Sequence, residues 1–530
     1  KYCGVGKYCS GSLYYHPSDA IVVCNIPKIF YPGNFRGSQR IAERKGCHMR
    51  RRIAVLLAGA LIGMTGCGGV KVVSPEASNS SQKAEFEKIK TPEDEKVVLN
   101  IVDWSDSTKD AREKLNEQFM KDHPNVTVNY TTLTQAQFNE TMLSGIRAGD
   151  APDLFPLPST VTFSTAVSEG WFLPMNLYLE EDFFAQIQPE FLCENVTMKG
   201  EDVYLLPEAV DIPSALLFYN RALLEEVGAE IDPEKVTWEE FRQVCEQVTE
   251  NGDGKYYGMV ASGAQKNRMD IELRAFSEVG GAKLGPAGQV FLQEEQTTFA
   301  DPEVVQAFDL YQELYEKGCF HPDTASLTAP EARKLFGEGK AAFLVQGAWC
   351  IPVWEKDNPD LDFGVMKVPV NEKLPDGKLL RPFTKGWMGI SANSKHPDIA
   401  AEYLKYLYSY EYQKKLMAQG GFVSVRGDLG EKDIENEHMR RYYQYAMEQS
   451  IAVPNPVAEN GNIELVYSMI QPVVPDFGDI ASSIFSGKEI YKKELKNYAS
   501  QMQENLERSV ETVKKQKDIS LSDFNYKDGR

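Results

Sequence analysis

The feature that most constrains the fold is an alternation of β-branched runs and amphipathic stretches over residues 97–155. Residues 97–102 read Val-Val-Leu-Asn-Ile-Val, a composition typical of a strand. Ala111, Leu115 and Phe119 then recur every fourth residue, which places them on one face of a helix. A further strand, helix and short strand follow. This β-α-β-α-β order predicts an α/β lobe with a largely parallel sheet.

Later segments again alternate between expected strands and expected helices. Residues 215–219 have the composition of a strand, and a short helix is expected over 223–227. Thr237 and Glu240 have the spacing of a capping box, which predicts a helix start. A helical apolar stripe over 495–513 is expected to pack against a lobe. No period of 20–50 residues recurs, which excludes a solenoid.

The charge is distributed unevenly along the chain. The formal net charge of the 530 residues is -20, but residues 1–66 hold ten Lys/Arg and only two acids. The remaining 47 basic and 75 acidic residues give residues 67–530 a net charge of -28. Because nucleic-acid binding depends on Lys and Arg that neutralise phosphates, this acidity argues against a nucleic-acid partner.

The basic front of the chain has the organisation of an export signal. Met49 is followed by three arginines, then by the apolar run Ile53 to Met64 and the small residues Thr65 and Gly66. These are the three regions of a secretory signal peptide. The apolar run is too short to span a bilayer, which needs ~20 residues. We therefore interpret 49–66 as a signal peptide.

Cys67 follows the small residues directly. The segment Met64-Thr65-Gly66-Cys67 resembles the lipobox of bacterial lipoproteins, although that family usually has Leu where this chain has Met64. The resemblance implies lipidation of Cys67 and an anchor in the outer face of the cell membrane, since two or more acyl chains hold a protein stably there. Residues 68–96 are polar and rich in Ser, Glu and Lys, which predicts a flexible tether.

Residues 1–48 have no clear periodicity. Because a signal peptide acts at the N-terminus, we expect translation to start at Met49. Four cysteines remain beyond the lipid site, Cys193, Cys245, Cys319 and Cys350, without the Cys-x-x-Cys spacing of a zinc site. A disulfide among them is left open.

Motifs for catalysis and cofactor binding are absent from the sequence. It contains no Walker A, G-x-S-x-G, H-E-x-x-H or dinucleotide-binding G-x-G-x-x-G pattern. The segment 250–255 has some features of a calcium loop but lacks its closing glutamate. No enzyme activity, metal or cofactor is therefore expected.

Several short motifs follow one another in a definite order. They include Ala148–Phe155 (AGDAPDLF), Tyr204–Pro207 with Leu217–Asn220, Thr237–Phe241 (TWEEF), Phe336–Trp349 (FGEGKAAFLVQGAW) and Gly386–Ser391. In this order they resemble the family 1 extracellular solute-binding proteins of ABC importers, the maltose-binding-protein-like group. The resemblance covers about residues 97–515. It implies two α/β lobes of the type II periplasmic-binding-protein fold, which close over a ligand in a cleft.

The same resemblance implies lobes that are discontinuous in sequence. The chain is expected to cross between them near 205–210, 368–382 and 430–445. The expected organisation is an upstream segment at 1–48, the signal peptide at 49–66, the lipidated cysteine and tether at 67–96, lobe 1 at 97–206 and 371–435, lobe 2 at 207–370, and C-terminal helices, mainly of lobe 2, at 436–530.

Candidate ligand-binding residues lie where strands end. A sugar offers an apolar C–H face and many hydroxyls, so aromatic platforms with nearby Asp, Glu, Asn and Arg suit it. Trp104, Trp349 and Trp387 each follow or precede an expected strand at the cleft side. Stacking on a ligand and packing in the core are both open for these three. Trp171 and Trp238 are expected to be structural.

Polar candidates accompany them. Glu208 and Asp211 lie next to the first crossing and are predicted to accept hydrogen bonds from ligand hydroxyls, with hinge or surface acids as the alternative. Ser159 lies just past the Pro-Asp strand. The predicted function is capture of a sugar or oligosaccharide outside the cytoplasm by a monomer, for delivery to an ABC permease. The alternatives are a binding protein for another small solute such as a polyamine, or a membrane-tethered glycoside hydrolase.

Overall fold

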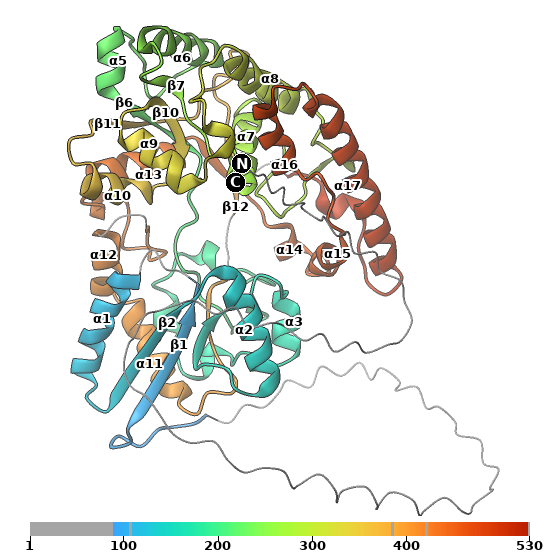
Figure 1. Ribbon diagram of the computed structural model, residues 1–530. Helices are drawn as coiled ribbons and strands as arrows, with labels where there is room; N and C mark the ends of the chain where they lie inside the picture. The colour runs from blue at the N-terminus through green and yellow to red at the C-terminus, as the bar shows by residue number, and fades with distance from the viewer. Residues whose placement is uncertain (1–87, 105–108, 383–385, 419–421, 528–530) are drawn as a thin grey trace, which may run out of the picture. The chain divides into compact units, whose positions relative to one another are not determined.

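The computed structural model (Figure 1) describes residues 88–104, 109–382, 386–418 and 422–527, which belong to one compact unit. The predicted signal peptide, Cys67 and the segment 1–48 lie outside the described residues. Within the described part, none of the helices combines the length and the apolar character needed to cross a membrane.

The first lobe is built on a four-stranded sheet of order β13-β3-β1-β2 (Figure 1). Its strands are β1 Val97–Asp103, β2 Val126–Thr132, β3 Leu154–Pro156 and β13 Met388–Ile390. Its helices are α1 Lys109–Asp122, α2 Gln135–Ala148, α3 Phe163–Ser168, α4 Glu181–Phe184, α11 Pro397–Leu407 and α12 Tyr410–Ala418. A small hairpin is formed by β4 Met198–Lys199 and β5 Asp202–Val203.

The first sheet confirms the largely parallel arrangement predicted from the sequence. β1 runs parallel to β2 over its full length, from Val97 opposite Val126 to Asp103 opposite Thr132, and it also runs parallel to β3. Only β13, which comes from much later in the chain, is antiparallel. Alternate residues of β1 are buried, so this strand has one covered face.

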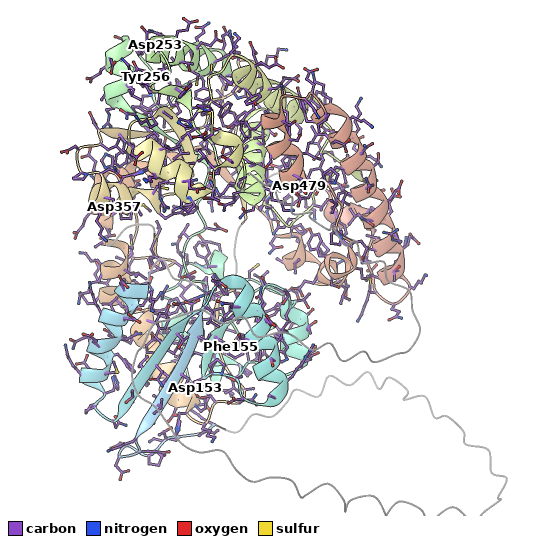
Figure 2. The ribbon with its side chains drawn as sticks, viewed as in Figure 1. Asp153, Phe155, Asp253, Tyr256, Asp357 and Asp479 are labelled. Carbon is purple, nitrogen blue, oxygen red and sulfur yellow. The ribbon has the colours of Figure 1, made fainter. Side chains whose placement is uncertain are left out.

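Asp153, in the Ala-Pro-Asp motif before β3, is a structural residue. Its carboxylate accepts hydrogen bonds from the backbone N–H of Asn100 at 2.8 Å and from the hydroxyl of Ser394 at 2.6 Å. Figure 2 labels it beside Phe155, which is fully buried. The motif therefore joins β1 to the segment that follows β13.

The second lobe is built on a four-stranded sheet of order β11-β6-β10-β7. Its strands are β6 Leu216–Asn220, β7 Tyr257–Met259, β10 Ala341–Gln346 and β11 Phe363–Met366. The helices of its first part are α5 Arg221–Val227, α6 Trp238–Gly252, α7 Lys266–Val279, α8 Pro302–Glu316, α9 Ala329–Gly337 and α10 Cys350–Asp357. Those of its C-terminal part are α13 Glu437–Glu448, α14 Pro456–Glu459, α15 Ile463–Met469, α16 Phe477–Ser482 and α17 Tyr491–Lys514.

This second sheet is mixed rather than parallel. β6 pairs antiparallel with both β10 and β11, and only β7 runs parallel to β10. All six residues of β10 are buried. The capping box at Thr237 is present and starts α6, as the spacing of Thr237 and Glu240 predicts. The late apolar stripe lies on α17, where Leu495, Leu506 and Val510 are buried.

Two further two-stranded sheets belong to the second lobe. β12 Leu379–Pro382 runs parallel to β14 Ser450–Val453, and β8 Leu292–Gln293 forms a hairpin with β9 Gln296–Thr297. β12 also contacts α7. Residues 379–382 therefore lie with the second lobe, whereas the sequence organisation places 371–435 in the first. The difference arises because the partner of β12, at 450–453, is not visible from local patterning.

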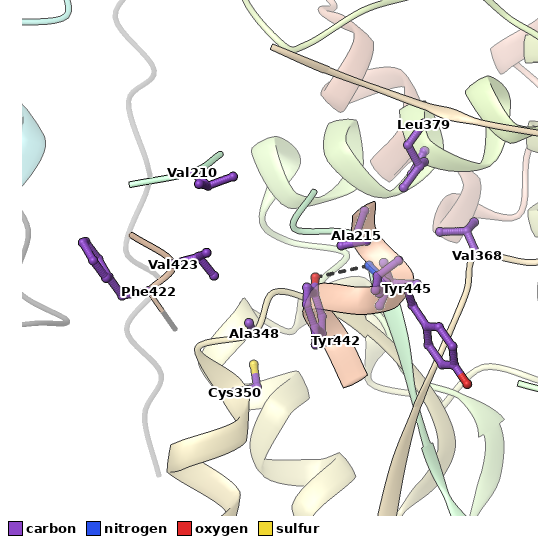
Figure 3. Close-up of a cluster of buried hydrophobic side chains, with 14 of the residues drawn as sticks. Val210, Ala215, Ala348, Cys350, Val368, Leu379, Phe422, Val423, Tyr442 and Tyr445 are labelled. Atoms are coloured by element: carbon purple, nitrogen blue, oxygen red, sulfur yellow. Dashed lines mark hydrogen bonds between the residues drawn. The ribbon is translucent and has the colours of Figure 1, made fainter. Parts of the chain in front are cut away.

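The first connection between the lobes is the segment 207–215. It follows Leu206, which is bridged to Met388 of the first sheet, and it leads to the start of β6. The backbone N–H of Val210 in this segment donates to the carbonyl of Val423 at 2.9 Å. Figure 3 shows Val210 and Val423 close together, with Ala348, Cys350 and Tyr442 grouped nearby.

The last residues of the predicted tether are ordered against the first lobe. Thr91 is buried, its backbone N–H donates to the Asp398 carboxylate at 2.6 Å, and its hydroxyl donates to the same group at 2.7 Å. The backbone N–H of Ile89 donates to the hydroxyl of Tyr178. In the structure these residues are part of the folded body, although their polar composition is typical of a linker. Cys193, Cys245, Cys319 and Cys350 are all free thiols.

Candidate ligand-binding site

Two of the predicted tryptophans donate hydrogen bonds to the same carboxylate at the carboxyl end of β1. Trp387 is 3% exposed, and its indole N–H lies 3.3 Å from Oδ1 of Asp103, the last residue of β1. The backbone N–H of Trp104 donates to the same oxygen at 2.7 Å. Trp104 is half-buried and packs edge-on against Phe138, with 5.4 Å between ring centroids. The sheet thus brings together two residues that are 283 positions apart in the sequence.

Glu208 belongs to the same network through Arg112 of α1. The guanidinium of Arg112 is 2% exposed, pairs with Oε1 of Glu208 at 2.9 Å and lies 4.7 Å from the centroid of the Trp387 ring. Burial by itself lowers the pKa of Arg112, but the facing groups, Tyr412 and Glu208 first among them, raise it overall. The acid predicted to accept ligand hydroxyls is thus held by a buried cation.

The other two polar candidates lie in different surroundings. Asp211 is half-buried on the first connection, and its charge raises the pKa of Arg381 on β12, which burial lowers overall. Ser159 is exposed after β3, where its hydroxyl accepts a hydrogen bond from the side-chain amide of Asn139 at 2.9 Å.

Trp349 is the predicted residue with the most accessible ring. It follows β10 and starts α10, and it is 41% exposed. Gly347 supports it, because a Cβ atom at that position would lie 2.2 Å from Cζ3 of the indole. The glycine therefore lets the ring pack directly on the backbone. A large exposed aromatic ring seated on a rigid strand end is the element that a stacking platform requires.

The structure adds two residues that the sequence analysis missed. Arg268, on the first turn of α7, places its guanidinium 5.5 Å from the centroid of the Trp349 ring and donates to the carbonyl of Ser214 at 2.9 Å. Gln346 ends β10 and is 1% exposed. Within the described part of the chain, Nε of Arg268 and Oε1 of Gln346 are buried without a hydrogen-bond partner.

No local motif could have identified these two residues. Arg268 lies in an ordinary helix start, and Gln346 ends a strand of otherwise apolar residues. The one available signal is the polar Gln346 inside a fully buried run, since a buried amide requires partners. The proximity of Arg268 to Trp349 depends on how the start of α7 packs beside the turn after β10, which the sequence does not reveal.

The arrangement suits binding rather than bond cleavage. Trp349 offers an apolar face, and the guanidinium of Arg268 offers a donor beside it. Among the described residues no group of His, Cys, Asp and Glu could hold a metal ion. Two surface hollows, of about 730 and 600 Å³, are lined by other residues, at the β8–β9 hairpin and between α1 and the first sheet.

The comparisons with known proteins agree with this architecture. The family model described as bacterial extracellular solute-binding protein matches residues 104–414. The galactooligosaccharide-binding protein of Bacillus subtilis is 25% identical over 370 residues, which are 68% of this chain and 77% of that protein. A protein of Brucella abortus described as a binding protein is 22% identical over 344 residues, 64% of this chain and 78% of its own.

Solved structures show the same fold at low sequence identity. The GacH receptor of Streptomyces glaucescens, studied unliganded and with acarbose, has a TM-score of 0.57 at 19% identity and covers 77% of this chain and 98% of its own. Maltose-bound MalE3 of T. maritima has a TM-score of 0.58 at 18% identity, with 77% and 99% coverage. At these identities the likeness establishes the two-lobed fold alone.

The family model spans more than half of the chain, and the two-lobed fold carries its motifs in the expected order. The chain belongs to the bacterial extracellular solute-binding proteins.

Proposed function

We propose that this protein captures a sugar or oligosaccharide outside the cytoplasm and delivers it to an ABC permease. The observation that carries the ligand class is Trp349, a residue that is 41% exposed at the end of β10, one of the two inner strands of the second sheet. Most large apolar side chains of the described chain are buried. An exposed tryptophan seated on a glycine therefore has the position of a platform for the C–H face of a sugar ring.

The arginine beside this ring fits a ligand hydroxyl. Nε of Arg268 is buried without a hydrogen-bond partner among the described residues, and its guanidinium lies 5.5 Å from the centroid of the Trp349 ring. Because a buried polar group without a partner costs about 1–3 kcal/mol, a ligand that supplies an acceptor beside the ring would gain affinity from it. The galactooligosaccharide-binding relative and the sugar-bound neighbours by fold support the same ligand class.

The alternative solutes fit less well. A polyamine would need acids that pair with ammonium groups, but Glu208 is paired with Arg112 and Asp211 faces Arg381. A glycoside hydrolase would need two carboxylates about 5–10 Å apart across a scissile bond. The exposed Trp349 has an arginine beside it rather than such a pair.

The membrane arrangement is part of the same proposal. The segment 49–66 would direct export, Cys67 would carry the lipid, and the residues up to about 88 would tether the folded body. In cells, Cys67→Ala should move the protein from the membrane fraction to the soluble extracytoplasmic fraction. Peptides from residues 1–48 in the purified lipoprotein would contradict a start at Met49.

Calorimetric titration tests the ligand class. The purified chain from residue 88 onward is titrated with a panel of mono- and oligosaccharides, with spermidine and a tripeptide as the competing classes. We expect saturable heat with at least one saccharide and none with spermidine or the tripeptide. Binding to spermidine or the tripeptide with no saccharide bound would overturn the ligand class. Release of free sugar during incubation with an oligosaccharide would instead indicate a hydrolase.

A further inference from the structure

The buried arginines that the structure describes each pair with a carboxylate, with one exception. Four arginines of the described chain are buried. Arg112 pairs with Glu208 at 2.9 Å, Arg274 with Asp270 at 2.8 Å and Arg426 with Asp428 at 2.6 Å. Arg268 is 5% exposed and has no ion pair in the described part of the chain. Because an isolated buried charge is costly, this exception requires a reason.

The surroundings of Arg268 do not neutralise its charge. Its guanidinium donates to the carbonyl of Ser214, a neutral acceptor, and its Nε has no partner in the part of the chain that the structure describes. Burial lowers the pKa of Arg268, which is the physical sign of a charge without sufficient solvation. Its position beside the exposed Trp349 ring places this charge next to the proposed ligand platform.

Glu272 lies four residues after Arg268, on the same face of α7. It is a poor counter-ion for Arg268. Glu272 is 1% exposed and accepts a hydrogen bond from the hydroxyl of Tyr311 at 2.9 Å. Burial raises the pKa of Glu272 to about 7, so below neutral pH its carboxyl group is mainly uncharged. Under those conditions Arg268 has no anionic neighbour among the described residues.

We propose that the ligand carries its own negative charge, and that Arg268 pairs with it beside Trp349: the substrate class is a sugar with a carboxylate, such as a uronic-acid oligosaccharide. This inference rests on the proposed function and narrows it. A guanidinium forms two parallel hydrogen bonds with a carboxylate, and this pairing is stronger than bonds to hydroxyls. The ligand would then supply a carboxylate partner for Arg268, whereas each of the other buried arginines has such a partner within the chain.

Matched ligands test the charge separately from sugar binding. The purified protein is titrated at pH 6 with uronic-acid oligosaccharides, including oligogalacturonides and glucuronate-containing disaccharides. Each is compared with its methyl ester, which keeps the ring and the linkage but lacks the charge. We expect at least one acid to bind at least about tenfold more tightly than its ester. In Arg268→Gln this ratio should fall to about one, whereas Trp349→Phe should weaken both members of the pair equally.

Each outcome has a distinct meaning. If neutral sugars bind and the acids show no preference over their esters, the acidic class is wrong and the sugar-binding function stands. If no saccharide binds, acidic or neutral, the proposed function itself fails. If the ratio survives in Arg268→Gln, the charge is recognised by another residue and the assignment to Arg268 is wrong. Comparing a ratio within one variant makes the result independent of partial misfolding.

The pH dependence gives a further readout that a purely structural role would not produce. Between pH 6 and pH 8 Glu272 becomes charged and competes with the ligand carboxylate for Arg268. The other groups facing Glu272 are Arg268 on α7 and Tyr311 on α8, and burial raises the pKa of Tyr311 well above its ordinary value. We expect the affinity for the acidic sugar to fall severalfold from pH 6 to pH 8, and Glu272→Gln to remove that fall. An unchanged pH profile in Glu272→Gln would contradict the pairing.

Discussion

Two buried glutamates on α7 make the stability of the folded protein depend on pH. Besides Glu272, the helix carries Glu278, whose carboxylate accepts the backbone N–H of Leu380 on β12 at 2.8 Å. Burial raises the pKa of Glu278 to about 8 and that of Glu272 to about 7, against about 4.5 for an unburied glutamate. The folded state therefore holds these protons more tightly than the unfolded state does.

Because the pKa of both glutamates is higher in the folded state than in the unfolded state, the direction of the pH effect on stability follows. Stability from both groups is fully present below about pH 4.5 and is lost as the pH rises through about 7 and 8. We expect the free energy of unfolding to decrease by a few kcal/mol, on the order of one per pKa unit shifted, between pH 5 and pH 8.5. Urea unfolding followed by circular dichroism measures it. Glu278→Gln should flatten the profile, and the exposed Glu504→Gln should leave it unchanged.

For the helices and strands, the hydrophobic period and the helix caps were predictable from the sequence, whereas the pairing of the strands was not. The strands and helices from 97 to 156 follow the predicted β-α-β-α-β order, because alternation and four-residue spacing report directly which face is buried. The antiparallel pairing of β6 with β10 and β11 has no local signal, since all of these strands read as apolar runs. The placement of β12 beside β14 depends equally on distant residues.

At the candidate site, too, some residues were predictable from the sequence and others were not. Trp349 was identifiable from its place after an expected strand, and the structure leaves its ring accessible. Trp387 satisfied the same criterion but is 3% exposed, because Arg112 and Asp103 cover it. Arg268 was missed because its role depends on the packing of α7 beside the turn after β10.

The turn from β10 to α10 provides a prediction about the platform. In Gly347→Ala the new methyl group would overlap the indole of Trp349, so the ring must move. We expect ligand affinity to fall by roughly tenfold, about 1.4 kcal/mol, while the protein remains folded. Titration calorimetry with thermal unfolding as a second readout checks this. Gly430→Ala is the matched control, since no atom lies within 4 Å of a Cβ there; equal affinity in both variants would contradict the role of Gly347.

At the scale of the whole molecule, one glutamate joins the two lobes away from the connecting segments. Glu464 of α15, in the C-terminal part, accepts the backbone N–H groups of Phe163 and Ser164 at 3.0 and 3.1 Å and the hydroxyl of Ser164 at 2.8 Å. These groups start α3 of the first lobe, where a carboxylate is favourable because the first N–H groups of a helix lack partners. The contact joins segments about 300 positions apart.

Loss of this contact should favour separation of the lobes. In Glu464→Ala, the unliganded protein should show a larger radius of gyration by small-angle X-ray scattering, because a charge-assisted cap of about 1–2 kcal/mol is lost. Ligand affinity should fall severalfold, since binding energy must then replace it. Glu459→Ala, on the neighbouring helix α14, serves as the control. The same scattering curve for Glu464→Ala and the unaltered protein would contradict a role for this contact in lobe closure.

We propose that the exposed Trp349 ring is the platform on which this family member binds a sugar. The most direct test compares the unaltered protein with Trp349→Ala by titration calorimetry, using the saccharide that binds most tightly in the panel. We predict saturable binding to the unaltered protein and a loss of roughly 30-fold or more in Trp349→Ala, about 2 kcal/mol, as expected for a central aromatic contact. Equal affinity of the two proteins for that saccharide, or no saccharide bound by either, would contradict sugar binding on Trp349.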